Sequence, residues 1–265
     1  MELKPGLSAL VTGGASGIGK AISLALGEKG IFVTVVDFSE ERGKEVASLV
    51  EKENAKFHPK LGFPSAMFIR CDVTNTNEAN DNVGISFISS PHRQISRVGM
   101  LLRECYIHCQ NYPNLKFCKS SHALKLINLK RVGGSGELAA AFKKHLATYG
   151  GLDICVNSAG IGTHEPFHKD QTENSGLWRR TINVNLVAVI DCTRLAIQTM
   201  QAAKKPGVII NMGSASGLYP MYVDPIYSAS KGGVVLFTRS LAPYKRHGIR
   251  VNVLCPEVIS NILGL

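Results

Sequence analysis

The glycine-rich stretch at residues 13–19 constrains the fold of this chain more than any other feature. It reads Gly-Gly-Ala-Ser-Gly-Ile-Gly, follows a short apolar run at residues 7–12 and opens a helical pattern that continues to Lys29. Glycines at this spacing let the backbone approach a pyrophosphate closely, and the helix N-terminus adds the positive end of its dipole. The sequence therefore predicts a strand, a tight turn and a helix that together bind a dinucleotide.

Strands and helices continue to alternate along the chain. Residues 31–36 are too apolar for a half-exposed strand, which is typical of a parallel strand covered on both faces. Further strands are expected at residues 66–71, 152–157, 208–212 and 249–254. Further helices are expected at residues 39–53, with Ser39 as N-cap, and at residues 138–149, 175–203 and 226–247, the last kinked at Pro243. This order predicts an α/β fold with a doubly wound, Rossmann-like parallel sheet, whose ligands bind at the carboxyl ends of the strands.

Residues 77–136 break this alternation, because they show neither a helical nor a strand period. We expect one Rossmann-like dinucleotide-binding domain formed by residues 1–76 and 137–265, with residues 77–136 as an irregular insertion and a shortened C-terminus. Four side chains in the insertion have a spacing that zinc can use, although no strand-and-turn context supports a metal site and none is predicted. They are Cys105, Cys109, Cys118 and His122.

The composition limits which binding partners and which cellular compartment are expected. Between Glu78 and Arg131, eight Lys or Arg stand against three Asp or Glu and supply half of the net charge of +10. The basic and aromatic residues of this segment do not form an interleaved pattern, so nucleic-acid binding is not expected. No apolar run approaches the roughly 18 residues of a membrane span. Seven irregularly spaced cysteines without a secretory leader indicate a reducing compartment, and we expect the cytoplasm.

Acidic and amide side chains follow the predicted strands at the ligand-binding edge. Asp37 lies 24 residues after Gly13, where a carboxylate accepts hydrogen bonds from both ribose hydroxyls and repels a 2′-phosphate, which favours NAD over NADP. Asp72 can contact the adenine amino group, and Asn157 can bond across neighbouring strand ends, although both are also ordinary strand-end capping residues. The predicted cofactor-binding residues are Gly13, Ser16, Gly17, Ile18, Gly19, Asp37, Asp72, Val73, Asn157, Ala159, Gly160, Tyr227, Lys231, Pro256 and Ile259.

Tyr227 and Lys231 stand at positions i and i+4 of a predicted helix and share one face. A tyrosine can exchange a proton with an alcohol near neutral pH only if its pKa falls from about 10, and an adjacent ammonium favours the phenolate. Ser214, at the end of a strand, can hydrogen-bond a substrate oxygen, and Asn185 can hold a water behind Lys231. A Tyr/Lys pair at this spacing is common on solvated helices. The hypothesis of a catalytic site therefore depends on the pair together with Ser214 and Asn185.

This combination resembles the classical short-chain dehydrogenase/reductase family, in which residues 12–19, 157–160, Asn185, Ser214 and Tyr227 with Lys231 fall in the family order. The stretch at 209–218, with 225–227, is most similar to the 15-hydroxyprostaglandin dehydrogenase branch. By that resemblance Tyr227 is the general acid/base, Ser214 orients the substrate, Lys231 binds the nicotinamide ribose and Asn185 completes a catalytic tetrad.

The resemblance also implies the reaction and the assembly. The branch uses NAD and oxidises a secondary alcohol on a lipid-like substrate. Family members pair through the helices that correspond here to residues 175–203 and 226–247, so a homo-oligomer is expected.

The C-terminal part departs from the family pattern. Glu257 follows Pro256 where the family has Gly, Asn261 stands where Thr is usual, and the chain stops at Leu265, before the usual substrate-covering helices. Two hypotheses follow. The first is an oxidoreductase that transfers a hydride between NAD and a secondary alcohol or ketone. The alternative is an NAD-binding protein with impaired or no turnover, because of the insertion and the missing C-terminal lid.

Overall fold

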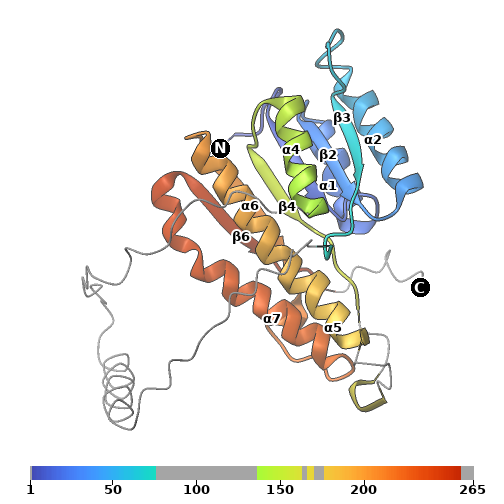
Figure 1. Cartoon of the computed structure of the whole chain (residues 1–265), viewed down its shortest axis with the longest axis vertical. Coiled ribbons are helices and arrows are strands. Elements are labelled where there is room, and N and C mark those ends of the chain that lie inside the picture. The colour runs from blue at the N-terminus through green and yellow to red at the C-terminus, as the bar shows by residue number, and fades with distance from the viewer. Residues whose placement is uncertain (1, 76–135, 163–165, 170–175, 258–265) are drawn as a thin grey trace. The chain divides into compact units, whose positions relative to one another are not determined.

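The computed structural model describes residues 2–75, 136–162, 166–169 and 176–257 (Figure 1). These residues belong to one compact unit, which spans Met1–Asn77 and Gly134–Leu265. The predicted insertion, apart from Gly136, and its candidate zinc ligands lie outside the described residues, as does Ile259.

Six parallel strands form one sheet in the order β3-β2-β1-β4-β5-β6, which confirms the predicted Rossmann-like sheet (Figure 1). The strands are β1 (Ser8–Thr12), β2 (Phe32–Asp37), β3 (Ala66–Arg70), β4 (Ile154–Asn157), β5 (Gly207–Met212) and β6 (Ile249–Leu254). The α-helices are α1 (Gly17–Gly27), α2 (Glu40–Asn54), α4 (Glu137–Tyr149), α5 (Gly176–Ile182), α6 (Ala188–Ala202) and α7 (Pro225–Ser240). The strand order reverses between β1 and β4, and such a switch point is where open α/β sheets bind ligands.

Helices cover both faces of the sheet, which explains why its strands are so apolar. All five residues of β1 are buried. Leu10 faces a core formed with Phe142 of α4 and Met200 of α6. Its neighbours Ala9 and Val11 face the opposite core, which α1 and α2 complete. The alternation of side chains along each strand therefore supplies both cores at once.

The predicted helix at residues 175–203 is one helical run in which a π-helical turn at Asn183–Val187 joins α5 to α6. Two other local expectations need correction. Pro243 does not kink α7, because α7 ends at Ser240 and a 3₁₀ helix at Ala242–His247 contains the proline instead. Ser39 occupies the N-cap position of α2, but its hydroxyl accepts a hydrogen bond from Arg42 Nε and none from the backbone of the helix.

We expect the buried His145 to make the stability of the fold depend on pH. This α4 residue is completely buried, and its Nδ1 lies 2.7 Å from Thr34 Oγ1. Burial lowers the pKa of His145 to about 4 from the ordinary 6.5. The unfolded chain therefore takes up a proton first as the pH falls through 6.5, and the free energy of unfolding should drop by about 2–3 kcal/mol between pH 7 and 4.5. Urea titrations at both pH values measure this drop, and an equal drop in the non-titrating variant His145→Gln would contradict the assignment.

Candidate active site

The glycine-rich turn lies between the carboxyl end of β1 and the start of α1. Gly13 and Gly17 have positive φ angles of 65° and 49°. A β-carbon on Gly13 would lie 2.7 Å from the Ala159 backbone, and one on Gly19 would lie 2.1 Å from the Gly13 carbonyl oxygen. Only glycine allows the turn to pack this closely on the loop after β4 and on its own helix. Ser16, in extended conformation, and Ile18 stand on the accessible side of the turn.

Asp37 ends β2 beside this turn. Its Oδ2 accepts a hydrogen bond from Ala15 N at 3.0 Å, and its Oδ1 accepts one from Ser39 N at 2.9 Å. An ionised carboxylate has about four acceptor sites, so Asp37 fixes the turn and retains capacity for ribose hydroxyls. In the sheet register Asp37 pairs with Arg70 of β3, whose guanidinium lies 5.1 Å from the ring centroid of the exposed Phe38. Arg70 was missed from the sequence, because only strand pairing places it beside Asp37.

Asp72 closes the turn that follows β3. Its Oδ1 accepts hydrogen bonds from both the backbone N and the hydroxyl of Thr74, at 2.9 and 2.7 Å. Its own N–H donates to Glu137 Oε2 at 2.7 Å, which ties this turn to the first turn of α4. The neighbouring Val73 packs against the core on the α4 side. Asp72 is half-buried at the edge of the sheet where the strands have their carboxyl ends.

Asn157 is the centre of a buried polar network. Its Nδ2 donates to Asn211 Oδ1 at 2.8 Å and to Thr193 Oγ1 at 3.0 Å, and Asn211 Nδ2 donates to Thr238 Oγ1 at 2.9 Å. Both Nδ2 hydrogens of Asn157 are therefore used within the protein. The network fixes the ends of β4 and β5 against α6 and α7, and this rigid support positions the loop that carries Ala159 and Gly160.

Tyr227 and Lys231 lie on α7, as their spacing predicts. Asp224 caps this helix by accepting a hydrogen bond from Tyr227 N at 2.9 Å. Lys231 is buried, its Nζ donates to the Met212 carbonyl at 2.9 Å, and the same Nζ lies 5.6 Å from the centroid of the Tyr227 ring. The ammonium is thus held between the end of β5 and the tyrosine.

Ser214 follows two residues after Met212 and leads into the 3₁₀ turn Ala215–Gly217. A β-carbon on Gly217 would lie 2.6 Å from the Lys231 backbone, so this turn packs directly on α7. Ser214 Oγ accepts a hydrogen bond from Ser216 N at 3.2 Å, and Ala215 N donates to the Pro256 carbonyl at 2.9 Å. The ends of β5 and β6 therefore meet around Ser214, and the turn that follows it packs on α7.

Asn185 lies in the π-helical turn between α5 and α6, a feature often found at functional sites. Its Oδ1 accepts from Ile161 N and its Nδ2 donates to Ile161 O, both at 2.8 Å, and Nδ2 also donates to Ser230 Oγ at 3.1 Å. A β-carbon on Gly160 would lie 3.3 Å from Lys231 Nζ and 3.4 Å from Asn185 Oδ1. Gly160 therefore stands where Asn185 and Lys231 converge, and Ser230 is a partner that the sequence analysis missed.

The electrostatics of Lys231 suit a role beside a tyrosine. Burial lowers the pKa of Lys231 to about 8 from 10.5, and the nearby Cys255 acts in the opposite direction. The side chain is consequently still a cation at neutral pH.

A family model described as short chain dehydrogenase matches residues 8–87 and 131–262. The chain belongs to this family. It is 29% identical over 263 residues to 15-hydroxyprostaglandin dehydrogenase (NAD+) of Homo sapiens, covering 97% of this chain and 70% of that protein. It is 41% identical over 122 residues to 3beta-hydroxysteroid dehydrogenase 1 of Eggerthella lenta, covering 46% of each.

Solved structures agree with the fold. A structure titled putative short-chain alcohol dehydrogenase, from Sinorhizobium meliloti, aligns with 98% of this chain and 75% of its own, at a TM-score of 0.67 and 24% identity. The predicted family and fold are therefore confirmed, and the chain is a member of an oxidoreductase family. In the described part of the chain, no helix is both long enough and apolar enough to span a membrane.

Proposed function

We propose that this chain transfers a hydride between NAD and a secondary alcohol or ketone, with Tyr227 as general acid/base. The observation that carries the proposal is the buried cation of Lys231, held by the Met212 carbonyl with its Nζ 5.6 Å from the Tyr227 ring centroid. A buried ammonium beside a tyrosine is costly for folding and is the arrangement that proton transfer at neutral pH needs. Bound NAD supplies the hydride acceptor or donor.

The roles of the other residues follow from their positions. Tyr227 Oη takes the hydroxyl proton when an alcohol is oxidised and returns it when a ketone is reduced. Ser214 orients the substrate oxygen, and Lys231 favours the phenolate and binds the nicotinamide ribose. Asn185 is a positioning residue that holds the loop at Ile161 and, with Gly160, shapes the space next to Lys231.

The glycine-rich turn, with its bound Asp37, fits a dinucleotide. Asp37 keeps acceptor sites for the ribose hydroxyls, and its negative charge opposes a 2′-phosphate. The 15-hydroxyprostaglandin dehydrogenase relatives carry NAD(+) in their names. We therefore propose NAD as the cofactor. Residues 158–160 and the Pro256 backbone, which lie at the same edge of the sheet, complete the proposed cofactor site.

Asp37→Asn tests this assignment, because the amide keeps one acceptor while the negative charge is lost. We expect NAD to bind about 10- to 100-fold more weakly, since hydrogen bonds to a charged acceptor contribute about 1.5–3 kcal/mol. Affinity for NADP should rise, because Arg70 lies beside residue 37 and can pair with a 2′-phosphate. Fluorescence titrations with both dinucleotides measure the two changes. An unchanged NAD preference would remove Asp37 from the cofactor site.

An apolar surface borders the proposed substrate position. The segment between Ser214 and Tyr227 exposes four large apolar side chains, with exposed fractions of 56%, 70%, 89% and 80%. They are Leu218, Tyr219, Tyr222 and Val223. This surface supports a lipid-like or otherwise apolar alcohol as the small-molecule substrate.

The activity itself is tested by following NADH absorbance with a panel of secondary alcohols that includes hydroxylated fatty acids and sterols. Turnover with NAD is the expected result. Dinucleotide binding without turnover on any of them would favour the alternative, an NAD-binding protein without catalysis. The described residues give that alternative no separate support.

We also propose a homo-oligomer formed through the helices at residues 175–203 and 226–247. Val187, Ile190 and Leu236 are exposed on these segments, and pairing with a second copy would cover them. Light scattering of the purified chain measures its mass and tests this assembly. Of the described cysteines, all four are free thiols, which supports a cytoplasmic location.

A further inference from the structure

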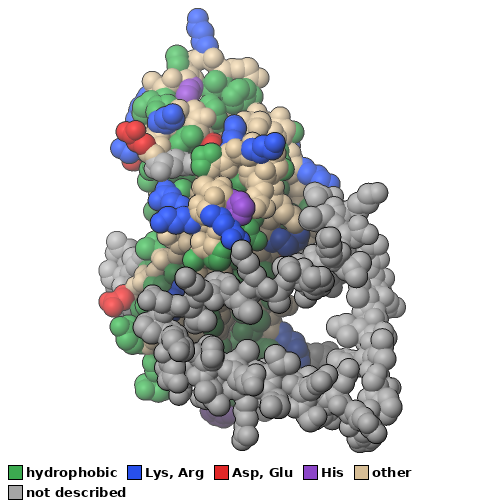
Figure 2. All heavy atoms as spheres, turned by 90° about the vertical axis from the view of Figure 1, so that its left-hand side faces the viewer, with side chains coloured by type: hydrophobic (Ala, Val, Ile, Leu, Met, Phe, Trp, Pro, Cys, Tyr) green, Lys and Arg blue, Asp and Glu red, His purple; other side chains and the backbone are tan. Residues whose placement is uncertain are grey.

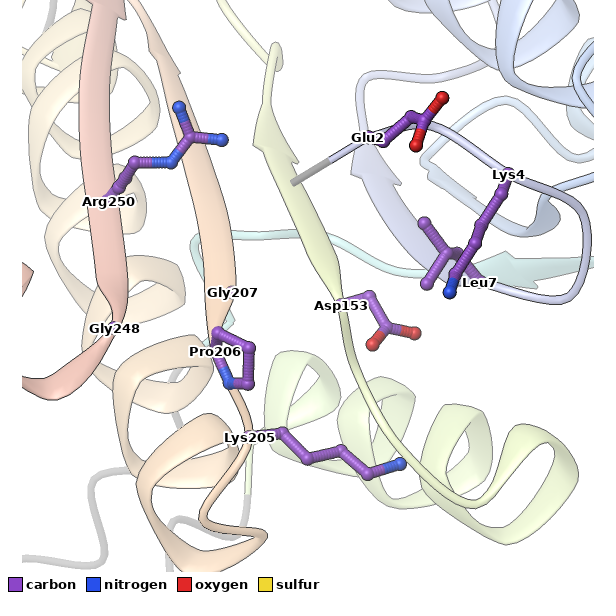
Figure 3. Close-up of a pocket in the computed structure, with 9 residues that line it drawn as sticks. All are labelled: Glu2, Lys4, Leu7, Asp153, Lys205, Pro206, Gly207, Gly248 and Arg250. Atoms are coloured by element: carbon purple, nitrogen blue, oxygen red, sulfur yellow. The ribbon is translucent and has the colours of Figure 1, made fainter.

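The amino ends of the strands form a face opposite the proposed active site. The N-terminal segment joins this face through Gly6 N, which donates to the Gly30 carbonyl at 3.0 Å. The turns at residues 203–206 and 245–248 meet beside it, where Gly207 N donates to the Gly248 carbonyl at 3.2 Å. A hollow of roughly 420 Å³ opens among these segments, and Figure 3 shows Lys4, Lys205 and Arg250 around it.

This face is strongly cationic. Seven exposed Lys or Arg lie on its segments, and none of them forms an ion pair with a described acid. They are Lys4, Lys60, Lys204, Lys205, Lys245, Arg246 and Arg250. Two acids, Glu2 and Asp153, line the hollow, and Asp153 already accepts a hydrogen bond from Ser8 N at 2.9 Å. In the view of Figure 2, the coloured surface shows more Lys and Arg side chains than Asp and Glu side chains.

Apolar side chains are exposed on the part of this face that carries Lys4 and Lys60. Leu3, Phe57 and Leu61 are 51%, 43% and 36% exposed. The Phe57 ring packs closely on Gly30, because a β-carbon on Gly30 would lie 2.8 Å from this ring. The same β-carbon would lie 2.9 Å from Pro5. We call this set of seven cations and three apolar residues the basic face.

Helix dipoles account for only some of the cations on the basic face. Cations are favoured near helix C-termini, and α6 ends close to Lys204 and Lys205. Arg250 lies on a strand and Lys4 precedes one, so the dipoles do not account for them. The dipoles also give no reason for exposed Leu and Phe side chains on this face.

We propose that the basic face docks on the surface of an anionic phospholipid membrane. Clustered Lys and Arg attract acidic head groups, and Leu and Phe side chains enter the interface between head groups and acyl chains. A nucleic acid would use the cations but would gain little from the exposed leucines. The glycine-rich turn and Tyr227 lie at the opposite end of the sheet, so docking through the basic face does not use the residues of the proposed active site. This inference is independent of the proposed reaction.

Co-sedimentation of the whole chain with vesicles tests the proposal. We compare phosphatidylcholine vesicles with vesicles that also contain 30% phosphatidylserine, where each Lys or Arg near the surface strengthens binding about fivefold. We expect binding to the anionic vesicles only, and binding weakened at least about tenfold in the triple variant Lys204→Gln/Lys205→Gln/Arg250→Gln. The matched control, Lys44→Gln/Lys143→Gln/Lys144→Gln, removes the same charge elsewhere and should bind like the wild type.

A second variant separates the apolar contribution. Leu3→Ser/Leu61→Ser keeps every charge and should reduce the binding that persists at high salt. Failure of the wild type to bind anionic vesicles would overturn the proposal, as would equal losses in the triple variant and its control. Binding to single-stranded RNA together with no binding to vesicles would also overturn it and assign the face to nucleic acid.

Discussion

Tyr227→Phe is expected to lower kcat by about 10²–10⁴-fold, because the variant keeps the ring and loses the hydroxyl that we propose exchanges the proton with the substrate. The fold should be unaffected. Tyr227 contributes its backbone N to the Asp224 cap and its carbonyl to Ser230, and both contacts survive the substitution. NAD affinity should change little, since the glycine-rich turn and Asp37 are untouched.

The measurement combines steady-state NADH formation with a dinucleotide titration and a thermal melt. Tyr244→Phe is the matched control, because Tyr244 is a partly buried tyrosine that packs on the core away from Lys231. The control should retain activity. If Tyr227→Phe turns over as fast as the wild type, Tyr227 is not the general acid/base and the proposed mechanism fails.

The fold could be predicted from the sequence because the patterns that indicate its strands, helices and first turn are local. Apolar runs of strand length, each followed by a helical period, determined the order of elements, and glycines at fixed spacing located the first turn. The predictions at Pro243 and Ser39 were wrong because a local sequence rule allowed more than one outcome at each position. Pro243 is compatible with a kink or a helix end, and only the packing around it decides. Ser39 is a favourable N-cap residue, but its hydroxyl is engaged by Arg42 in the folded chain.

The residues of the candidate site could be predicted from the sequence only in part. Tyr227 and Lys231 share a helix face at a spacing that sequence reveals, and Asp37 follows a recognisable strand. The partners that hold them come from other elements of the sheet. Arg70 reaches Asp37 through strand register, and Ser230 reaches Asn185 across two helices. Sequence separation conceals such pairs, so no periodicity could have predicted them.

The Asn157 network shows the same limit. From the sequence, an amide at a strand end is equally suited to a cofactor contact and to a structural bond. Its partner Asn211 is 54 residues away and directly adjacent in the sheet register. Because unsatisfied buried amides are costly, the presence of this neighbour determines what the Asn157 Nδ2 group binds.

Lys231→Met is expected to abolish turnover and to make the chain more stable at pH 7. The wild type buries a cation whose pKa falls to about 8 from 10.5, and this difference corresponds to about 3 kcal/mol of unfavourable free energy. Methionine has a similar length and no charge, so it removes that cost and loses one hydrogen bond to Met212, worth about 1 kcal/mol. The net gain should be about 1–2 kcal/mol.

The pH dependence of the free energy of unfolding tests whether the buried Lys231 cation destabilises the fold. In the wild type the cost is fully present below pH 8, where Lys231 is charged in both states, and it fades between pH 8 and 10.5 as the buried amine loses its proton first. The stability advantage of Lys231→Met should therefore shrink between pH 7 and pH 10 in urea titrations, whereas Lys205→Met, at an exposed site, should show no such trend. A variant less stable than the wild type at pH 7 would mean that the ammonium stabilises the fold. In that case its burial would need no functional explanation, whereas a stabilised and inactive variant would mean that the fold tolerates this cost for the chemistry at Tyr227.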